Sequence, residues 1–158
     1  MTTPDFKAVL LGAIAQATGQ YYRLVLVVGS SQSGKTGLLQ TLAREKGYTL
    51  LNVNLELSKR LLELTRTQRT RHVERVLKEV IASAAGDVLL LDNLEILFDA
   101  GLAVEPLRLL QGSSRNRTLV AAWNGQYRDG VLTYAEPGHP EHARFKQVEA
   151  IVVSTEAP

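Results

Sequence analysis

The sequence predicts an α/β fold in which a parallel sheet of about five strands is flanked by helices. Short aliphatic runs recur along the chain, and several stop at a glycine or a polar residue, as strands buried on both faces often do. Segments with the apolar spacing of amphipathic helices lie between these runs. Strands that alternate with helices favour parallel pairing with right-handed crossovers.

The elements can be placed in chain order. The strands that we expect span residues 24–28, 48–54 (the weakest), 88–91, 118–123 and 150–153. The helices that we expect span about 5–17, 38–46 and 73–86, with a further helical segment at 93–98. Residues 125–149 contain several glycines and prolines and are expected to form a loop. We expect one domain, residues 1–158, with an N-terminal helix within 1–21 and a core at about 22–153.

Composition excludes several classes of protein. Hydrophobic residues make up 45% and charged residues 22% of the chain, which is typical of a folded globular protein. There is no cysteine, so disulfides, cysteine-ligated zinc and thiol catalysis are all excluded. The three histidines lack the spacing of a metal site, and zinc is not expected. A formal charge of +2 permits a nucleic-acid partner without arguing for one.

No segment resembles a membrane span or a secretion signal. The longest aliphatic run, Leu24–Val28, is far shorter than the roughly 20 apolar residues that cross a bilayer. The first residues also lack the basic start of a secretory signal. We therefore expect a cytoplasmic protein with no membrane partner.

Residues 29–36 match the phosphate-binding pattern G-x-x-x-x-G-K-[ST]. They follow a predicted buried strand and precede a predicted helix, so backbone N–H groups and the helix N-terminus would face the phosphates of ATP. In this P-loop NTPase arrangement Lys35 would reach the β- and γ-phosphates, and the Thr36 hydroxyl would ligate Mg²⁺. A plain glycine-rich turn is the alternative. The nucleotide-binding residues that we expect are Gly29, Ser30, Ser31, Gln32, Ser33, Gly34, Lys35, Thr36 and Gly37.

The strand at 88–91 stops at Asp92, which is our candidate for the second Mg²⁺ ligand. An ordinary N-cap of the helical segment at 93–98 is the alternative. The next residue is Asn93, whose amide cannot accept a proton as a water-polarising glutamate would. Glu95 is the nearest substitute and thus a candidate catalytic residue, although a surface charge explains it equally well. Hydrolysis is therefore expected to be slow.

Asn124 follows the strand at 118–123, at the sheet edge where α/β folds bind ligands. It could orient water or touch the γ-phosphate, whereas the alternative is a turn asparagine before Gly125. Arginines commonly stabilise the charge that develops during nucleotide hydrolysis. Most arginines of the second half should be surface residues, and the candidates in order of interest are Arg144, then Arg115 and Arg117, with Arg128 also near a strand end.

A basic stretch, Lys59–Lys78, includes seven lysines and arginines between residues 59 and 78 and few acidic residues. A solvated helix face is the ordinary explanation, and a contact with DNA or a partner protein is the other. No aromatic residues are interleaved with these charges, so a stacking platform for single strands is not indicated.

These motifs resemble an AAA+-type ATPase core. The loop at 29–36 is similar to Walker A, the strand end at 91–93 to Walker B, and Asn124 to sensor 1. Arg144 before the last predicted strand is similar to the arginine finger of that superfamily. The resemblance covers about residues 22–153. It departs from the family at Asn93, and no helical lid with a sensor 2 arginine is expected in residues 1–158.

A narrower resemblance rests on the stretches at 92–98, 121–125 and 134–141, which look like the BrxF family. BrxF is the small P-loop component of BREX antiphage systems. This resemblance implies a bacterial nucleotide-binding subunit that works with a methyltransferase and other BREX proteins in phage defence.

The resulting hypothesis is an ATP- and Mg²⁺-binding ATPase whose hydrolysis is slow or needs assembly. We expect an ATP-dependent homo-oligomer in which Asn124 senses the γ-phosphate and a neighbouring subunit contributes an arginine, Arg144 being the candidate. A nucleotide switch that recruits partners or DNA with negligible turnover is the first rival, which Asn93 favours. A small-molecule kinase is the second, although the sequence shows no acceptor site.

Overall fold

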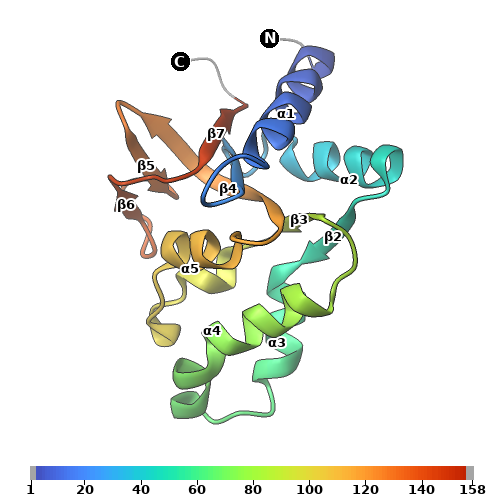
Figure 1. Cartoon of the computed structure of the whole chain (residues 1–158). Coiled ribbons are helices and arrows are strands. Elements are labelled where there is room, and N and C mark those ends of the chain that lie inside the picture. The colour runs from blue at the N-terminus through green and yellow to red at the C-terminus, as the bar shows by residue number, and fades with distance from the viewer. Residues whose placement is uncertain (1–2, 156–158) are drawn as a thin grey trace.

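A central sheet lies between two layers of helices in the computed structural model, which describes residues 3–155 (Figure 1). The helices are α1 (Thr3–Ala17), α2 (Lys35–Lys46), α3 (Val53–Leu61), α4 (Arg66–Ser83) and α5 (Pro106–Ser113), with two 3-10 turns, η1 (Glu95–Phe98) and η2 (Ala100–Leu102). The strands are β1 (Leu24–Gly29), β2 (Thr49–Asn52), β3 (Val88–Asp92), β4 (Thr118–Arg128), β5 (Val131–Tyr134), β6 (Ala143–Phe145) and β7 (Ile151–Ser154).

The main sheet has the strand order β2-β3-β4-β1-β7, and all of its pairings are parallel. This arrangement confirms the predicted α/β fold with a parallel five-stranded sheet. Strand β4 lies between β1 and β3, so the residues that follow these three strands come out at the same edge of the sheet. The carboxyl edge of a parallel sheet is where α/β folds bind ligands.

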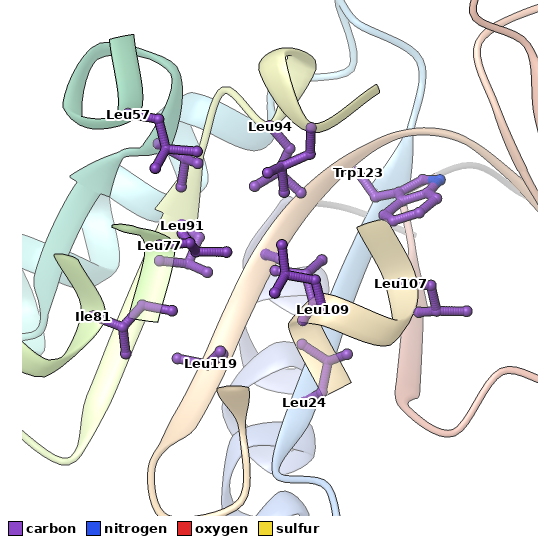
Figure 2. Packing of buried hydrophobic residues seen from close by; sticks show 14 of the residues in the cluster. Leu24, Leu57, Leu77, Ile81, Leu91, Leu94, Leu107, Leu109, Leu119 and Trp123 are labelled. Atoms are coloured by element: carbon purple, nitrogen blue, oxygen red, sulfur yellow. The ribbon is translucent and has the colours of Figure 1, made fainter. Parts of the chain in front are cut away.

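The two faces of the sheet bury alternate residues of each strand, as the two-residue period of a strand requires. Leu24 and Leu26 of β1 belong to the cluster that includes residues of α3, α4 and α5, together with Leu119 of β4. Figure 2 shows part of this cluster, where Leu109 of α5 lies beside Leu24 and Leu119. Val25 of β1 belongs to the cluster on the other face, which includes residues of α1 and α2.

Helix α1 is the predicted N-terminal helix, and it lies against the sheet through one apolar stripe. Phe6, Leu10 and Ile14 are buried in the cluster on this face. An ion pair between Lys7 and Glu45 joins α1 to α2, and its hydrogen bond lowers the pKa of the Glu45 carboxyl. In residues 3–155 no helix has the length and apolar character needed to cross a bilayer.

The region at 125–149 differs from the predicted loop. Strand β4 does not stop at residue 123 but continues to Arg128 and pairs in antiparallel fashion with β5, which in turn pairs with β6. Asp129 and Gly130 form the turn between β4 and β5, and both have positive φ angles, 53° and 76°. An Asp-Gly pair between alternating residues favours a two-residue hairpin, and the sequence analysis missed this signal. We call residues 125–145 the antiparallel extension.

Three smaller boundaries also differ from the prediction. Strand β2 ends at Asn52 instead of residue 54, because the Asn52 side chain accepts a hydrogen bond from Leu55 N (3.0 Å) and caps α3. Helix α4 begins at Arg66, where Thr65 and Gln68 form a capping box. The segment at 93–98 contains the short 3-10 turn η1. Helix α2 ends where predicted, at Gly47 with φ 71°.

Candidate functional site

Three neighbouring strands bring the candidate residues to the carboxyl edge of the sheet. Gly29, at the end of β1, is paired with Asn124 of β4. Asp92, at the end of β3, is paired with Asn52 of β2. Strand β4 lies between β1 and β3 and adjacent strands are about 4.8 Å apart, so Gly29 and Asp92 are on strands about 10 Å apart, with Asn124 on the strand between them.

A cavity of about 230 Å³ opens at this edge. Of the predicted loop residues it is lined by Ser31, Gln32, Gly34, Lys35 and Thr36. The predicted residues from the other strands also line it: Asp92, Glu95 and Asn124, joined by Asn93 and Tyr134. The structure thus brings most of the candidates to one cavity. Gly29, Ser30, Ser33, Gly37 and Arg144 do not line it.

The local structure explains why two positions of the loop are occupied by glycine. Gly34 precedes α2 with φ 88°, a left-handed conformation that glycine adopts without a steric penalty. A Cβ atom at Gly29 would lie 1.9 Å from Thr155 Oγ1 and 2.6 Å from Ser33 Oγ, so the backbone passes too close for any side chain. Gly37 lies in the first turn of α2 with open space around it.

The Lys35 side chain is buried, with 4% of its surface exposed. Its ammonium group donates hydrogen bonds to the carbonyl oxygens of Gly29 (3.0 Å) and Ser30 and to Ser33 Oγ (3.3 Å). The Ser33 hydroxyl in turn donates to the Ser30 carbonyl (2.8 Å). The positive charge therefore lies at the loop itself, where it can face an anion bound by the loop.

Asp92 is 8% exposed, and its Oδ1 accepts a hydrogen bond from Asn93 N (2.9 Å). The turn η1 begins only at Glu95, and the residue at its N-cap, Leu94, makes no capping hydrogen bond, so the helix-cap explanation of Asp92 is wrong. A carboxylate and the Thr36 hydroxyl on one cavity are oxygen ligands of the kind that Mg²⁺ prefers. Within residues 3–155 no three His, Asp or Glu side chains gather as a metal site, so phosphate and water oxygens would have to complete the coordination.

The backbone conformation at position 93 explains why an asparagine follows Asp92. Asn93 has φ 57°, and asparagine enters this left-handed region more readily than most residues. Its carbonyl oxygen accepts a hydrogen bond from Asn54 N (2.9 Å), which ties the turn to α3. Glu95 is exposed and lines the cavity two residues later.

Asn124 lies within β4, not in a turn, so the turn explanation of this residue is wrong. Its backbone oxygen accepts a hydrogen bond from Ala135 N (2.9 Å), and its side chain lines the cavity. Gly125, which the turn explanation placed in a turn after Asn124, lies within β4, where the backbone of β5 passes close to it. A Cβ atom at Gly125 would lie 1.8 Å from the Thr133 carbonyl oxygen, to which the indole nitrogen of Trp123 donates (2.9 Å).

The candidate arginines separate into two groups. Arg117 donates hydrogen bonds to the carbonyl oxygens of Ile81, Ala84 and Gly86 at the end of α4. Arg115 lies over the ring of Tyr21 (3.5 Å from its guanidinium carbon to the ring centre). Both precede β4 and lie at the amino edge of the sheet, opposite the cavity, so neither can contribute to this site in its own chain.

The two remaining arginines lie on the antiparallel extension. Arg128, at the last position of β4, is exposed. Arg144 of β6 lines a second cleft of about 1,010 Å³, which also borders Ser30, Glu95 and Asn124. Arg144 thus faces a space that adjoins the cavity of its own chain.

The basic stretch on α3 and α4 is a mixed-charge surface. Arg60 pairs with Glu56 (2.9 Å), and the pairs Arg75–Glu79 (2.8 Å) and Lys78–Glu74 (3.2 Å) lie on α4. Separately, the guanidinium group of Arg69 donates to the carbonyl oxygens of Leu61 (2.7 Å) and Leu64 (3.0 Å). Within the Lys59–Lys78 stretch, the exposed basic residues for which the described part of the chain shows no such contact are Lys59, Arg66 and Arg71. These contacts weaken the case for DNA binding.

Sequence reasoning missed Tyr134, which lines both the cavity and the second cleft. Its ring stacks on Phe98 of η1, with ring centres 3.4 Å apart and planes at 4°. Burial raises the pKa of Tyr134 to about 12, assisted by the charges of Glu95 and Glu141. The Asp-Gly turn and the alternation of residues 131–134 could have placed Tyr134 on a hairpin strand beside the site.

Solved structures resemble this chain in fold. C. elegans PCH-2 matches with a TM-score of 0.51 and 15% identity over 100% of this chain and 43% of that chain. AMPPCP-bound DnaA from Aquifex aeolicus (0.48, 17% identity, 94% of this chain and 44% of that chain) and Drosophila ORC bound to DNA (0.47, 17%, 95% and 42%) are more distant. The chain spans less than half the length of these proteins. No protein-family model and no curated protein matches the sequence.

The likeness to PCH-2 is a likeness of fold: the chain has an α/β core built on a parallel sheet with the strand order β2-β3-β4-β1-β7. The comparisons give no support to the narrower resemblance to BrxF.

Proposed function

We propose that this chain, as a single domain over residues 1–158, binds ATP and Mg²⁺ at the carboxyl edge of its sheet. The observation that carries the proposal is the one cavity that joins Lys35 and the loop to Thr36, Asp92 and Asn124. An ammonium group, a hydroxyl, a carboxylate and an amide are together the groups that bind a phosphate chain and its metal. The residues therefore fit the group that the fold implies.

Each residue of the site has a distinct task in this proposal. The N–H groups of residues 29–37 and the ammonium of Lys35 bind the phosphates, while Thr36 and Asp92 hold Mg²⁺. Asn124 orients the terminal phosphate or a water molecule, and the Glu95 carboxylate accepts a proton from that water. Bound ATP supplies the phosphoanhydride bond that is hydrolysed.

Hydrolysis is proposed to be slow or to depend on assembly, because the amide of Asn93 cannot accept a proton and Glu95 is exposed. In an ATP-dependent homo-oligomer the arginine of one subunit, with Arg144 as the candidate, would act at the site of the next. A switch that binds ATP without turnover and recruits partners or DNA is the alternative, and Asn93 favours it because its amide cannot accept a proton.

A finer proposal concerns the biological setting. The resemblance of residues 92–98, 121–125 and 134–141 to BrxF supports a role in BREX phage defence, with other BREX proteins as partners. DNA would be contacted through Lys59, Arg66 and Arg71 of the Lys59–Lys78 stretch, the exposed basic residues that no acidic side chain pairs with in residues 3–155.

The nucleotide site is tested by calorimetric titration of ATP with Mg²⁺ into the wild type and Lys35→Ala. We expect Lys35→Ala to abolish measurable binding, because it removes the charge that faces the phosphates. The matched control is Lys46→Ala at the exposed end of the same helix, which should bind ATP as the wild type does. Unchanged ATP affinity in Lys35→Ala would show that the loop is not the nucleotide site.

The metal site is tested with Asp92→Ala, titrated with ATP in the presence and absence of Mg²⁺. The variant should weaken Mg²⁺-dependent binding much more than Mg²⁺-free binding, since a metal-bound carboxylate matters only with the metal. Asp87→Asn, at the exposed opposite end of β3, is the control. Equal losses under both conditions would exclude Asp92 as the metal ligand.

The shared-site mechanism is tested by mixing inactive variants. Arg144→Ala should bind ATP but lack turnover alone, and mixing it with Lys35→Ala should restore part of the activity. ATP should also promote self-association, with turnover that rises more than linearly with protein concentration. Turnover strictly linear in protein concentration would contradict the shared site, and absent turnover would support the nucleotide switch.

A further inference from the structure

The Tyr134 side chain is held at the boundary between the nucleotide cavity and the larger cleft next to it. Only 5% of its surface is exposed. Its hydroxyl group nevertheless makes no hydrogen bond to any residue from 3 to 155, although the residue lines both spaces. The hydroxyl oxygen is not among the fully buried polar atoms without a partner, so it is open to these spaces and available to a ligand or water there.

The position of the Tyr134 ring is set from several sides. Phe98 stacks on the ring, and Trp123 packs against it edge-on with ring centres 6.0 Å apart. Trp123 also donates to the Thr133 carbonyl, and Ala135 N donates to Asn124 O, so the backbone on both sides of Tyr134 is fastened to β4. A hydroxyl held in this way is preorganised, because little side-chain freedom remains to be lost when it binds a ligand.

The Tyr134 hydroxyl is expected to act as a hydrogen-bond donor. Burial and the nearby carboxylates of Glu95 and Glu141 raise the pKa of Tyr134 to about 12, so the phenol is neutral at physiological pH. A neutral phenol can donate one hydrogen bond, and the acceptors that a P-loop brings into its cavity are phosphate oxygens. Asn124, on the same cavity, is the amide expected at the terminal phosphate.

We propose that the Tyr134 hydroxyl donates a hydrogen bond to an oxygen of the terminal phosphoryl group of a nucleoside triphosphate bound by the loop. The antiparallel extension then distinguishes a triphosphate from a diphosphate. Phe98 lies six residues after Asp92, so the contact also links the metal-binding strand end to the extension through one aromatic stack. This inference rests on the proposed nucleotide site.

The test compares the affinities of two nucleotides within each protein. MgADP and the Mg²⁺ complex of AMPPCP, an ATP analogue that is not hydrolysed, are titrated by calorimetry into the wild type and Tyr134→Phe. Phenylalanine keeps the stack on Phe98 and removes only the hydroxyl. We expect about a tenfold loss of AMPPCP affinity, the effect of one hydrogen bond to a charged group, with ADP affinity unchanged.

Tyr127→Phe is the matched control, because Tyr127 belongs to the same extension but lines neither space. It should leave both affinities unchanged. An unaltered ratio of AMPPCP to ADP affinity in Tyr134→Phe, or an equal loss of both, would overturn the role of Tyr134 and leave the nucleotide site standing. Failure of the wild type to bind either nucleotide would overturn the nucleotide site as well.

Discussion

The two halves of β4 differ in how they pair. Residues 118–124 lie between β1 and β3 in parallel register, with side chains buried on both faces of the sheet. Residues 125–128 pair only with β5, in antiparallel register, and are progressively more exposed. The first half fixes where the loop, Asp92 and Asn124 meet. The second half begins the extension that carries Tyr134 and Arg144 to the far side of the same site.

This difference shows how one strand can contribute both to the hydrophobic core and to the lining of the candidate site. The parallel half is held by burial from two helical layers, which is distributed over many side chains. The extension depends on a few local contacts: the Trp123 indole bond to Thr133, the space left by Gly125 and the aromatic stack of Tyr134 on Phe98. Single substitutions should therefore affect the extension selectively.

Gly125→Val should have the largest effect on stability. Its Cβ would overlap the Thr133 carbonyl oxygen, so β5 must move away from β4. We expect a loss of about 3 kcal/mol in the free energy of unfolding, at the upper end for overpacking. Urea denaturation followed by circular dichroism measures it. A stability equal to that of the wild type would show that β5 does not approach β4 as described.

Trp123→Phe should have a smaller effect. It removes the indole donor to the Thr133 carbonyl (2.9 Å) and part of a fully buried ring, and we expect a loss of about 2 kcal/mol. In hydrogen exchange the loss should appear mainly in residues 131–134, with the parallel strands little changed. Uniform loss of protection throughout the sheet would mean that the extension and the core unfold as one unit.

The same division explains what the sequence could predict. Aliphatic runs buried on both faces identified four of the parallel strands, because this pattern is a consequence of burial between two layers. The loop at 29–36 and Asp92 could be placed because their role depends on position relative to a strand. The hairpin that carries Tyr134 could have been predicted from the Asp129-Gly130 turn, but the stack of Tyr134 on Phe98 could not, because it joins residues far apart in the chain. Arg117 could not be distinguished from a catalytic arginine, because its carbonyl partners lie at the end of α4.

Gly112→Ala tests the helical layer that covers the parallel strands. Unlike Gly125, Gly112 has room for a side chain. Gly112 lies in α5, and nothing lies within 4 Å of the position that a Cβ atom would take. Alanine should therefore stabilise the protein by about 0.5–1 kcal/mol, because it favours the helix and restricts the unfolded chain. A rise in the urea midpoint without a change in slope is expected. A fall would show unrecognised crowding against α5.

Lys7→Ala should have the smallest effect. The hydrogen bond from Lys7 lowers the pKa of the exposed Glu45 carboxyl, so this contact stabilises the fold above the unfolded pKa and is lost as the pH falls through the folded value. The melting temperature of Lys7→Ala should be slightly below that of the wild type at pH 7. The two should converge as the pH falls through the lowered pKa of the Glu45 carboxyl. A constant difference at all pH values would assign the effect to packing instead of charge.

Hydrogen exchange with and without ATP and Mg²⁺ tests most directly the claim that one nucleotide site is built on both halves of β4. Addition of both should slow amide exchange in residues 29–36 and 92–95, on the parallel side, and in residues 131–135, on the extension. Lys35→Ala should show none of these changes. Unchanged exchange in residues 29–36 of the wild type would contradict the nucleotide site, and protection of the loop without any change in the extension would contradict its place in that site.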